Sequence, residues 1–260
     1  DTTLKLWNVQ QGKAFYTFKG HGVEISAIAV SQDGQLLASG GIDGTIKLWD
    51  IKTGSLIRSL VGHDGRVHCL AFSLDKRQLV SGCQGGFVAF WNLSTNQFRP
   101  SFHQHDAAVL SVAVSPDGQV VLVGSENHLV HVHHGRTGEL LDSLVGHSSA
   151  IYGLAIHPRE PVFFTGGKDG TIQRWAGAAL PFAKPDRGFV GHSDSVKSLA
   201  FNPSGQILAS GSRDRTIRQW NSTTGEWLSL LTGHSAAVNA IAYSASGNTL
   251  FSGSDDHTIR

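Results

Sequence analysis

Three residue types that together can hydrolyse an ester or amide recur along this chain in a fixed order, each time followed by a tryptophan. The first set is His21, Ser39, Asp43 and Trp49. A serine nucleophile needs a histidine base and a carboxylate that orients the base, so this set contains the residues of a catalytic triad. The order returns in two further sets: His147, Thr165, Asp169 and Trp175; His192, Ser210, Asp214 and Trp220. Because an enzyme domain rarely carries several identical active sites, the repetition favours a structural role.

A second group that could do chemistry is a cluster of histidines at positions 128, 131, 133 and 134. Imidazole is a common zinc ligand, and residues 131 and 133 share one face of a strand. No carboxylate or thiol completes a recognisable spacing, and His133 stands where other repeats have tryptophan. The phosphate-binding pattern GxxxxGK[ST] and the zinc motif HExxH do not occur in the sequence. We therefore predict no metal, no cofactor and no catalytic residue, and expect a protein that is not an enzyme.

The secondary-structure elements that position these residues can be predicted from a sequence repeat of about 42 residues. Tryptophan occupies positions 7, 49, 91, 175 and 220, and position 133 holds histidine in the same series. A second series of histidines at 21, 63, 105, 147, 192 and 234 keeps the same spacing, with one step of 45. A sustained period in this range predicts stacked copies of one supersecondary unit that share a core.

Each period reads as four short strands. In the copy that begins after His21, residues 25–30, 36–39, 45–49 and 56–61 are β-rich runs, separated by turns such as Asp33-Gly34 and Asp43-Gly44. Short turns predict that consecutive strands pair antiparallel as a meander. One such sheet cannot bury both faces alone, whereas several arranged radially can. The sequence therefore predicts an all-β fold, a β-propeller of four-stranded antiparallel blades.

The repeats resemble the WD-repeat family. The marks are Gly-His in five of the six periods, the turn aspartate and the pair Trp49-Asp50, with Trp91-Asn92 and Trp220-Asn221 as variants. The resemblance implies that tryptophan, serine or threonine, histidine and aspartate form a hydrogen-bonded chain that holds the blade together, in place of a triad. About six repeats are visible, and the family more often closes with seven blades. Residues 1–5 match residues 256–260, so we expect residues 1–260 to be a single propeller domain that starts and ends within a repeat, as a fragment of a larger array.

The copies are not equal. Gly85 stands at the position of the turn aspartate, and the next repeat has Val123, Asn127 and His133 in place of the marks. The three extra residues fall in the stretch 178–185, where Pro181 and Pro185 suit an edge strand or a loop because proline cannot donate to a ladder.

Composition excludes several classes of partner and location. The balance of 21 Lys and Arg against 20 Asp and Glu gives no strong attraction to nucleic acid or an anionic membrane. No apolar run approaches the roughly 20 residues that cross a bilayer. We expect Cys69 and Cys83 to be buried thiols on neighbouring strands, which favours a reducing, cytoplasmic location.

The resemblance also implies where partners bind. In the family, three variable positions in each repeat point to the partner face, and they carry over here to a set biased toward positive charge. The strongest candidates are Tyr152, Lys168, Lys197, Arg213, Arg66, His68, Glu24 and Ile42. Aromatic and arginine side chains are typical of interface hot spots. We hypothesise that the first four form the centre of a face that takes an acidic peptide or protein segment.

Three functions are compatible with the sequence. The first is a non-enzymatic protein-interaction scaffold. The alternative is a regulatory or sensing domain of a larger signalling kinase or NTPase whose catalytic part lies outside this chain. A third and weaker reading is a propeller hydrolase. Fold alone does not decide among them, and the sequence does not reveal the oligomeric state.

Overall fold

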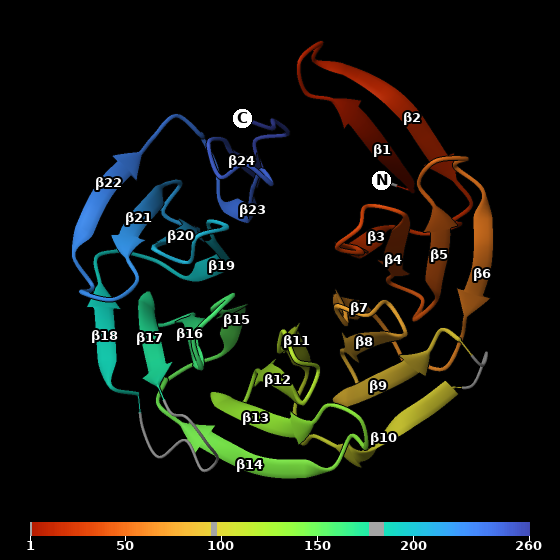
Figure 1. Ribbon diagram of the computed structural model, residues 1–260, viewed down its shortest axis with the longest axis horizontal. Coiled ribbons are helices and arrows are strands. Elements are labelled where there is room, and N and C mark those ends of the chain that lie inside the picture. Colours follow the sequence, from red (N-terminus) through yellow and green to blue (C-terminus); the bar gives the residue numbers. More distant parts are fainter. Residues whose placement is uncertain (1, 95–97, 177–184) are drawn as a thin grey trace. The chain divides into compact units, whose positions relative to one another are not determined.

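The computed structural model describes residues 2–94, 98–176 and 185–260, and the regular elements of these residues are all β-strands (Figure 1). The chain divides into two compact units. Unit 1 comprises residues 1–119 and 135–139, and unit 2 comprises residues 120–134 and 140–260. The expectation of one propeller domain over residues 1–260 stays a prediction.

Unit 1 contains the first eleven strands. They are β1 (Thr3–Asn8), β2 (Lys13–Lys19), β3 (Ile25–Val30), β4 (Leu36–Gly41), β5 (Ile46–Asp50), β6 (Leu56–Leu60), β7 (Val67–Phe72), β8 (Gln78–Cys83), β9 (Phe87–Asn92), β10 (Phe98–Gln104) and β11 (Val109–Val114). Strands β1 and β2 form a two-stranded sheet, while β3 to β6 and β7 to β10 each form a four-stranded sheet in chain order.

Unit 2 contains the remaining strands. They are β12 (Val120–Ser125), β13 (Leu129–His134), β14 (Leu140–Val145), β15 (Ile151–Ile156), β16 (Val162–Gly167), β17 (Thr171–Ala176), β18 (Arg187–Val190), β19 (Val196–Phe201), β20 (Ile207–Ser212), β21 (Ile217–Asn221), β22 (Trp227–Leu231), β23 (Val238–Tyr243) and β24 (Leu250–Ser254). Strands β15 to β18 and β19 to β22 form four-stranded sheets, β12 to β14 pair in chain order, and β23 and β24 form a two-stranded sheet.

Every sheet is an antiparallel meander, which confirms the predicted blade. The predicted ranges 25–30, 36–39, 45–49 and 56–61 agree with β3 to β6 within two residues at each end. The first strand carries the same register shift in five of the sheets, for example between Ile25 and Ala27 and between Val196 and Ser198. A shift that recurs at one place in five copies shows that these repeats share one backbone geometry.

The tight turn before each third strand requires a left-handed residue. Gly44 has a φ of 80°, and a Cβ placed on it would lie 2.5 Å from the carbonyl oxygen of His63. Glycine fits this site because it has no Cβ. His128, Arg215 and His257 occupy the same turn position in other repeats at φ of 70°, 72° and 65°.

Burial differs with position in the blade. The second strand is buried on both faces, as in β4 and β16, whereas the fourth strand is largely exposed, as in β6 and β22. In unit 1 the core cluster includes Leu48, Val67, Leu79 and Trp91, and in unit 2 another includes Phe164, Phe189 and Trp220. Fully burying a side chain such as Leu79 stabilises the fold by about 1.5–3 kcal/mol.

Two further predictions concern single segments. Pro185 lies in the loop before the short outer strand β18, and Pro181 falls outside the described residues. The described part of the chain contains no helix that is both long and apolar enough to span a membrane.

Candidate functional site

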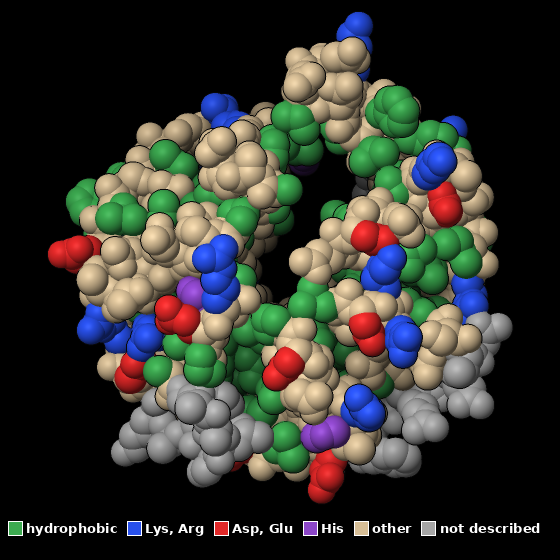
Figure 2. All heavy atoms as spheres, in the orientation of Figure 1, with side chains coloured by type: hydrophobic (Ala, Val, Ile, Leu, Met, Phe, Trp, Pro, Cys, Tyr) green, Lys and Arg blue, Asp and Glu red, His purple; other side chains and the backbone are tan. Residues whose placement is uncertain are grey.

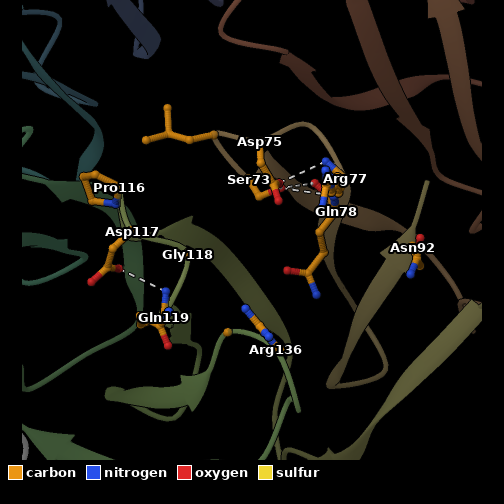
Figure 3. Close-up of a pocket in the computed structure, with 12 residues that line it drawn as sticks. Ser73, Asp75, Arg77, Gln78, Asn92, Pro116, Asp117, Gly118, Gln119 and Arg136 are labelled. Atoms are coloured by element: carbon orange, nitrogen blue, oxygen red, sulfur yellow. Dashed lines mark hydrogen bonds between the residues drawn. The ribbon is translucent and has the colours of Figure 1, made fainter. Parts of the chain in front are cut away.

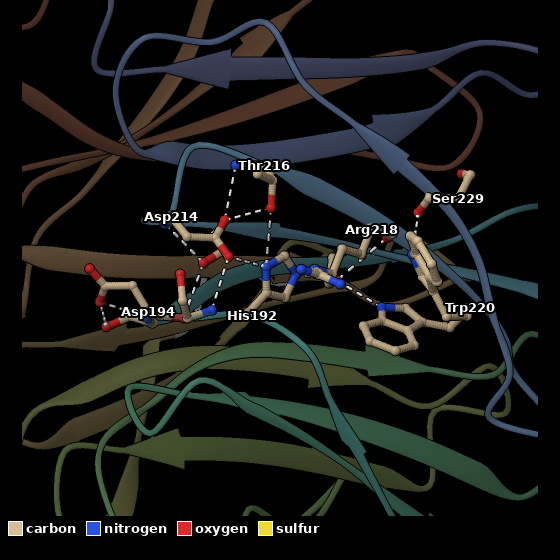
Figure 4. A network of polar contacts seen from close by, with 12 residues as sticks. His192, Asp194, Asp214, Thr216, Arg218, Trp220 and Ser229 are labelled. Carbon is tan, nitrogen blue, oxygen red and sulfur yellow. Dashed lines mark hydrogen bonds and ion pairs between the residues drawn. The ribbon is translucent and has the colours of Figure 1, made fainter.

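The histidine, hydroxyl, aspartate and tryptophan of one repeat form a continuous buried chain in unit 2. Figure 4 shows the imidazole of His192 between the carboxylate of Asp214 and the indole of Trp220. His192 Nδ1 lies 2.8 Å from Asp214 Oδ2, and His192 Nε2 lies 2.7 Å from Ser210 Oγ. The indole N–H of Trp220 donates to the same Ser210 hydroxyl at 2.9 Å. The hydroxyl oxygen therefore joins the third strand of the blade to the loop that precedes its first strand.

The neighbouring repeat of unit 2 has the same arrangement. His147 Nε2 lies 2.7 Å from Thr165 Oγ1, to which Trp175 Nε1 donates at 2.9 Å, and His147 Nδ1 lies 2.9 Å from Asp169 Oδ2. Thr171 adds a hydroxyl that donates to Asp169 at 2.7 Å. The final repeat repeats the histidine contacts, His234 with Ser252 and with Asp256, at 2.8 Å each.

Electrostatics fixes the direction of these hydrogen bonds. Burial by itself would raise the pKa of Asp214, but hydrogen bonds from Thr216 and His192 outweigh it, and the pKa lies below its usual range. Burial lowers the pKa of His192, and Asp214 only partly offsets this. A neutral imidazole beside an ionised carboxylate must donate through Nδ1, so Nε2 accepts from the Ser210 hydroxyl.

The same geometry argues against a nucleophilic role for the hydroxyls. Ser39, Thr165 and Ser210 are each 0% exposed, so a substrate carbonyl cannot reach their oxygens. Each oxygen is also already engaged by an indole and an imidazole. A triad serine must face a pocket that also supplies an oxyanion site.

The first repeat departs from the predicted chain. His21 Nε2 lies 2.7 Å from Ser39 Oγ, and Trp49 donates to Ser39 at 2.8 Å. The structure records no hydrogen bond between His21 and Asp43, however, and within the described residues the buried Nδ1 of His21 has no partner. The expectation that Asp43 ends the chain is therefore corrected for this repeat. In the two repeats with the full polar chain, the residue after the histidine is a serine, and the backbone N–H of that serine donates to the turn aspartate. In the first repeat this residue is Gly22, for which no such hydrogen bond is recorded.

In the second repeat Gly85 provides no carboxylate. His63 Nε2 still lies 2.6 Å from Ser81 Oγ, and Trp91 donates to Ser81 at 2.7 Å. Burial, with no opposing cause, lowers the pKa of His63 to about 4. This histidine is therefore neutral at physiological pH.

The histidine cluster of the third repeat has structural contacts. His131 Nδ1 lies 2.8 Å from Ser143 Oγ, and both His131 and His133 are buried. Among the described residues, no group of three or more His, Cys, Asp or Glu side chains is placed to hold a metal ion. Cys69 and Cys83 are free thiols on β7 and β8.

The four residues predicted as the centre of a partner-binding face all lie in unit 2, and the structure brings two of them into direct contact. Lys197 on β19 places its Nζ 3.5 Å from the centroid of the Tyr152 ring on β15. Lys168 and Arg213 follow the buried strands β16 and β20. Burial lowers the pKa of Lys197, and the charges of Arg213 and Lys168 lower it further. Lys168 and Arg213 therefore each lie close enough to Lys197 to repel its ammonium group.

Two carboxylates lie among these cations: Asp255, which is one of the variable positions implied by the family resemblance, and Asp194, which is not. Asp194 Oδ2 lies 3.9 Å from Arg213 Nε, and Asp194 and Asp255 both raise the pKa of Lys197 against the dominant lowering. Asp255 also accepts a hydrogen bond from Asn239. Asp194 could have been selected from the sequence because it lies two residues after the repeat histidine, in the loop before β19.

The remaining predicted residues lie in unit 1, where opposite charges pair. Arg66 Nη2 lies 3.4 Å from Glu24 Oε1, with both side chains substantially exposed. The backbone N–H of Ile42 donates to the Glu24 carbonyl oxygen at 3.0 Å, and Ile42 is 38% exposed. His68 is half-buried on β7. Figure 2 shows basic and acidic side chains interspersed on the face in view.

Unit 1 also contains a polar pocket of about 420 Å³ (Figure 3). Its walls come from the turns of two repeats and include Asp75, Arg77, Asp117 and Arg136. Both carboxylates accept hydrogen bonds from residues of the turn in which they lie. Asp75 accepts from the Ser73 hydroxyl at 2.6 Å and from the Arg77 N–H at 3.0 Å. Asp117 accepts the equivalent hydrogen bonds from the Ser115 hydroxyl and the Gln119 N–H. These bonds lower the pKa of both carboxyl groups. The turn motif thus accounts for the acidic residues of this pocket.

Comparison with known proteins gives one family and no curated relative. The family described as WD domain, G-beta repeat matches six segments: residues 12–50, 54–92, 96–134, 138–176, 183–221 and 225–260. No curated protein matches the chain significantly. The repeats of this family generally mediate protein–protein interactions. Since the matched segments cover most of the sequence and each spans one repeat histidine with the positions of its buried polar chain, this chain belongs to the WD-repeat family of β-propeller proteins.

Proposed function

We propose that this chain is a non-enzymatic scaffold that binds an acidic peptide or protein segment at the face formed by Tyr152, Lys168, Lys197 and Arg213. The proposal rests on the contact between the Lys197 ammonium and the Tyr152 ring, with the cations Lys168 and Arg213 close to Lys197. The buried hydroxyls of the repeats, which cannot serve as nucleophiles, support a role without catalysis.

The charge balance of the face favours an anionic partner. Three cations lie near two carboxylates, so the cluster has an excess of one positive charge. The depressed pKa of Lys197 shows that burial and repulsion outweigh the local acidic groups. A partner carboxylate placed among Lys168, Lys197 and Arg213 relieves that repulsion, because an opposite charge within a few ångströms stabilises the charged ammonium.

Exposure of the groups separates their roles. Arg213 has 64% of its side chain exposed, and its 3.9 Å contact with Asp194 is a weak surface pair. It can therefore exchange Asp194 for a partner carboxylate at small cost. Tyr152 is half-buried on a strand, and a rigid aromatic ring supplies contact area with little loss of side-chain entropy. We assign Arg213 and Lys168 to charge recognition and Tyr152 to anchoring.

The proposal is tested by fluorescence anisotropy with a labelled peptide of alternating Glu and Ser as the probe. We expect saturable binding that weakens as salt rises, and a dissociation constant raised at least about tenfold by Arg213→Glu or Lys168→Glu. Lys13→Glu, an exposed charge reversal on β2 of unit 1, is the matched control and should change binding little.

Three results with the single variants and the control peptide would contradict the proposal. They are the absence of binding at low salt, equal binding of a Lys and Ser peptide, and equal loss of affinity in the Lys13→Glu control. A double variant, Tyr152→Ala with Arg213→Glu, that binds as tightly as the unaltered protein would also reject this face.

We further propose a cytoplasmic location. The two cysteines are free thiols although they lie on adjacent strands of one sheet, which suits a reducing compartment.

A further inference from the structure

The polar pocket of unit 1 lies where the second and third repeats differ from the others in sequence (Figure 3). Its lining includes Gln78, which pairs with Asn92, the residue after the repeat tryptophan. The same position holds an aliphatic residue in four other repeats: Leu36, Val120, Val162 and Ile207. The first three of these belong to hydrophobic clusters or pack against them. In the second repeat a polar amide therefore stands where its equivalents contribute to the core.

The residue before Gln78 differs in the same way. The carbonyl oxygen of Arg77 accepts a hydrogen bond from the Leu93 N–H at 2.8 Å. The carbonyl group that accepts the equivalent bond belongs to a glutamine in three other repeats: Gln35, Gln119 and Gln206. Arg77 therefore places a guanidinium group where these repeats have an amide. Its side chain is exposed and lines the pocket, so a ligand can reach the charge.

Gly135 leaves space between the turns that line the pocket. The residue that donates this backbone hydrogen bond is Ile51 in the first repeat, Leu93 in the second and Gly135 in the third. Ile51 and Leu93 pack against hydrophobic clusters, whereas Gly135 has no side chain. A Cβ on Gly135 would lie 2.1 Å from the Gly118 carbonyl oxygen, so the glycine also allows two turns to approach closely. The next residue, Arg136, is thereby placed at the pocket.

Several polar side chains of the pocket are available to a ligand. The backbone N–H groups of Arg77, Gln78 and Gln119 donate within their own turns. Within the described part of the chain, no hydrogen bond is recorded for the guanidinium group of Arg77 or for the side-chain amides of Gln78 and Gln119. Figure 3 shows the side chain of Gln78 extending from its turn toward Arg136. A ligand can therefore bind these three side chains without breaking a hydrogen bond of the fold.

The charges of the lining indicate what the ligand carries. Two arginines, Arg77 and Arg136, face two carboxylates, Asp75 and Asp117, so the lining has no net charge. An arginine can hold a carboxylate or phosphate through two parallel N–H···O bonds. Each aspartate accepts two hydrogen bonds within its turn, but a carboxylate has about four lone-pair sites and can also accept from a ligand hydroxyl. A lining without net charge favours one anionic group with several hydroxyls over a polyanion.

We propose that this pocket binds a small polyhydroxylated molecule that carries one oxyanion group, the chemistry shared by sugar phosphates and sugar acids. Arg77 and Arg136 hold the oxyanion, the Gln78 amide binds a neighbouring hydroxyl, and Asp75 and Asp117 accept from further hydroxyls. The volume of about 420 Å³ is in the range of small-molecule sites. The site lies in unit 1 and the proposed peptide-binding face in unit 2, so either proposal can fail without the other.

Isothermal titration calorimetry with glucose 6-phosphate, gluconate and glucose as probes tests the proposal. We expect saturable binding of glucose 6-phosphate or gluconate with a dissociation constant of about 1 mM or lower. Glucose lacks the oxyanion and should bind at least about tenfold more weakly, because it loses the charge-assisted hydrogen bonds to arginine. The ratio of the first two affinities shows whether the oxyanion is a phosphate or a carboxylate.

Two variants test the residues by installing side chains that other repeats carry at the same positions. Arg77→Gln should raise the dissociation constant at least about tenfold, and Gln78→Leu at least about threefold, since the second loses only a neutral hydrogen bond. Arg159→Gln is the matched control, because it removes an exposed arginine from the corresponding turn of the fourth repeat, between β15 and β16. It should bind the probes like the unaltered protein.

Four results would overturn the proposal. They are no binding of either anionic probe at millimolar concentrations, equal binding of glucose, binding unchanged by both pocket variants, and an equal loss in Arg159→Gln. Melting curves of all three variants should match that of the unaltered protein, which would show that a loss of affinity comes from the pocket and not from unfolding.

Discussion

Removing the turn aspartate should have very different effects in two repeats that look alike in sequence. In the fifth repeat Asp214 accepts hydrogen bonds from His192 Nδ1 at 2.8 Å, from Ser193 N–H at 3.1 Å and from the Thr216 hydroxyl at 2.6 Å. In the first repeat Asp43 accepts from the Thr45 N–H at 3.0 Å and makes no bond to His21. We expect Asp214→Ala to destabilise the protein far more than Asp43→Ala.

The magnitude follows from which donors water can reach after the substitution. The His192 side chain is only 1% exposed, so its buried Nδ1–H keeps only the longer contact to the Thr216 hydroxyl oxygen at 3.4 Å, at a cost of about 1–3 kcal/mol. The Thr216 hydroxyl loses a charge-assisted bond, which is stronger than a neutral one. We therefore expect a loss of about 3 kcal/mol for Asp214→Ala. The bond from Thr45 is exposed, and its loss should cost less than about 1 kcal/mol.

Urea denaturation followed by tryptophan fluorescence measures both variants, with Asp214→Asn as a control that keeps an acceptor oxygen near His192. Asp214→Asn should recover part of the loss. If the two units unfold separately, the midpoint of the unit 2 transition is the relevant quantity, because a single free energy then has no defined meaning. Equal destabilisation by Asp43→Ala and Asp214→Ala would refute the reasoning, since it would mean that the carboxylate acts without the imidazole contact.

Two other predictions follow from burial. The pKa of His63 is about 4 in the folded protein and 6.5 in the unfolded chain, so the unfolded chain binds the proton first as the pH falls. The free energy of unfolding should therefore decrease by about 3 kcal/mol between pH 6.5 and about pH 4. Denaturation of His63→Gln at several pH values should show a weaker pH dependence of this free energy, and an unchanged pH dependence would contradict the prediction. Cys83 is 0% exposed, and burial raises the pKa of the Cys69 thiol, so both thiols should react slowly with iodoacetamide in the folded protein. Mass spectrometry should find neither cysteine alkylated in the folded protein and both alkylated in urea. Rapid alkylation of Cys69 in the folded protein would show that its thiol is not buried.

Much of the fold was predictable because each blade is specified locally. The alternation of apolar residues and the turn dipeptides place β3 to β6 within two residues, and the same pattern recurs at the period of the tryptophans. Even the third repeat, which lacks the usual marks, keeps the strands β12 and β13 because Val121, Leu122 and Val123 remain buried. Strand formation depends on this local pattern, so the loss of the polar chain does not abolish it.

The candidate site was predictable only in part. The variable positions beside the repeat marks include Tyr152, Lys168, Lys197 and Arg213, but their spacing does not reveal that Lys197 lies on the Tyr152 ring. Nor does it reveal Asp194 within reach of Arg213. The contact of Lys197 with Tyr152 joins side chains from neighbouring repeats, and its geometry depends on how adjacent blades of unit 2 pack. Asp194 and Arg213 belong to one repeat, but they lie in separate loops, before β19 and after β20, that only the folded sheet brings together.

By itself, the sequence determined the period, the four antiparallel strands of each blade and the residue types of the buried polar chain. The physical reason is that strand alternation, turn chemistry and hydroxyl–indole spacing act within one repeat. Only the tertiary structure decided that Asp214 reaches its histidine while Asp43 does not, and that Lys197 lies over the ring of Tyr152. A hydrogen bond or a cation over a ring requires placement to within fractions of an ångström, which the pattern of residue types does not specify.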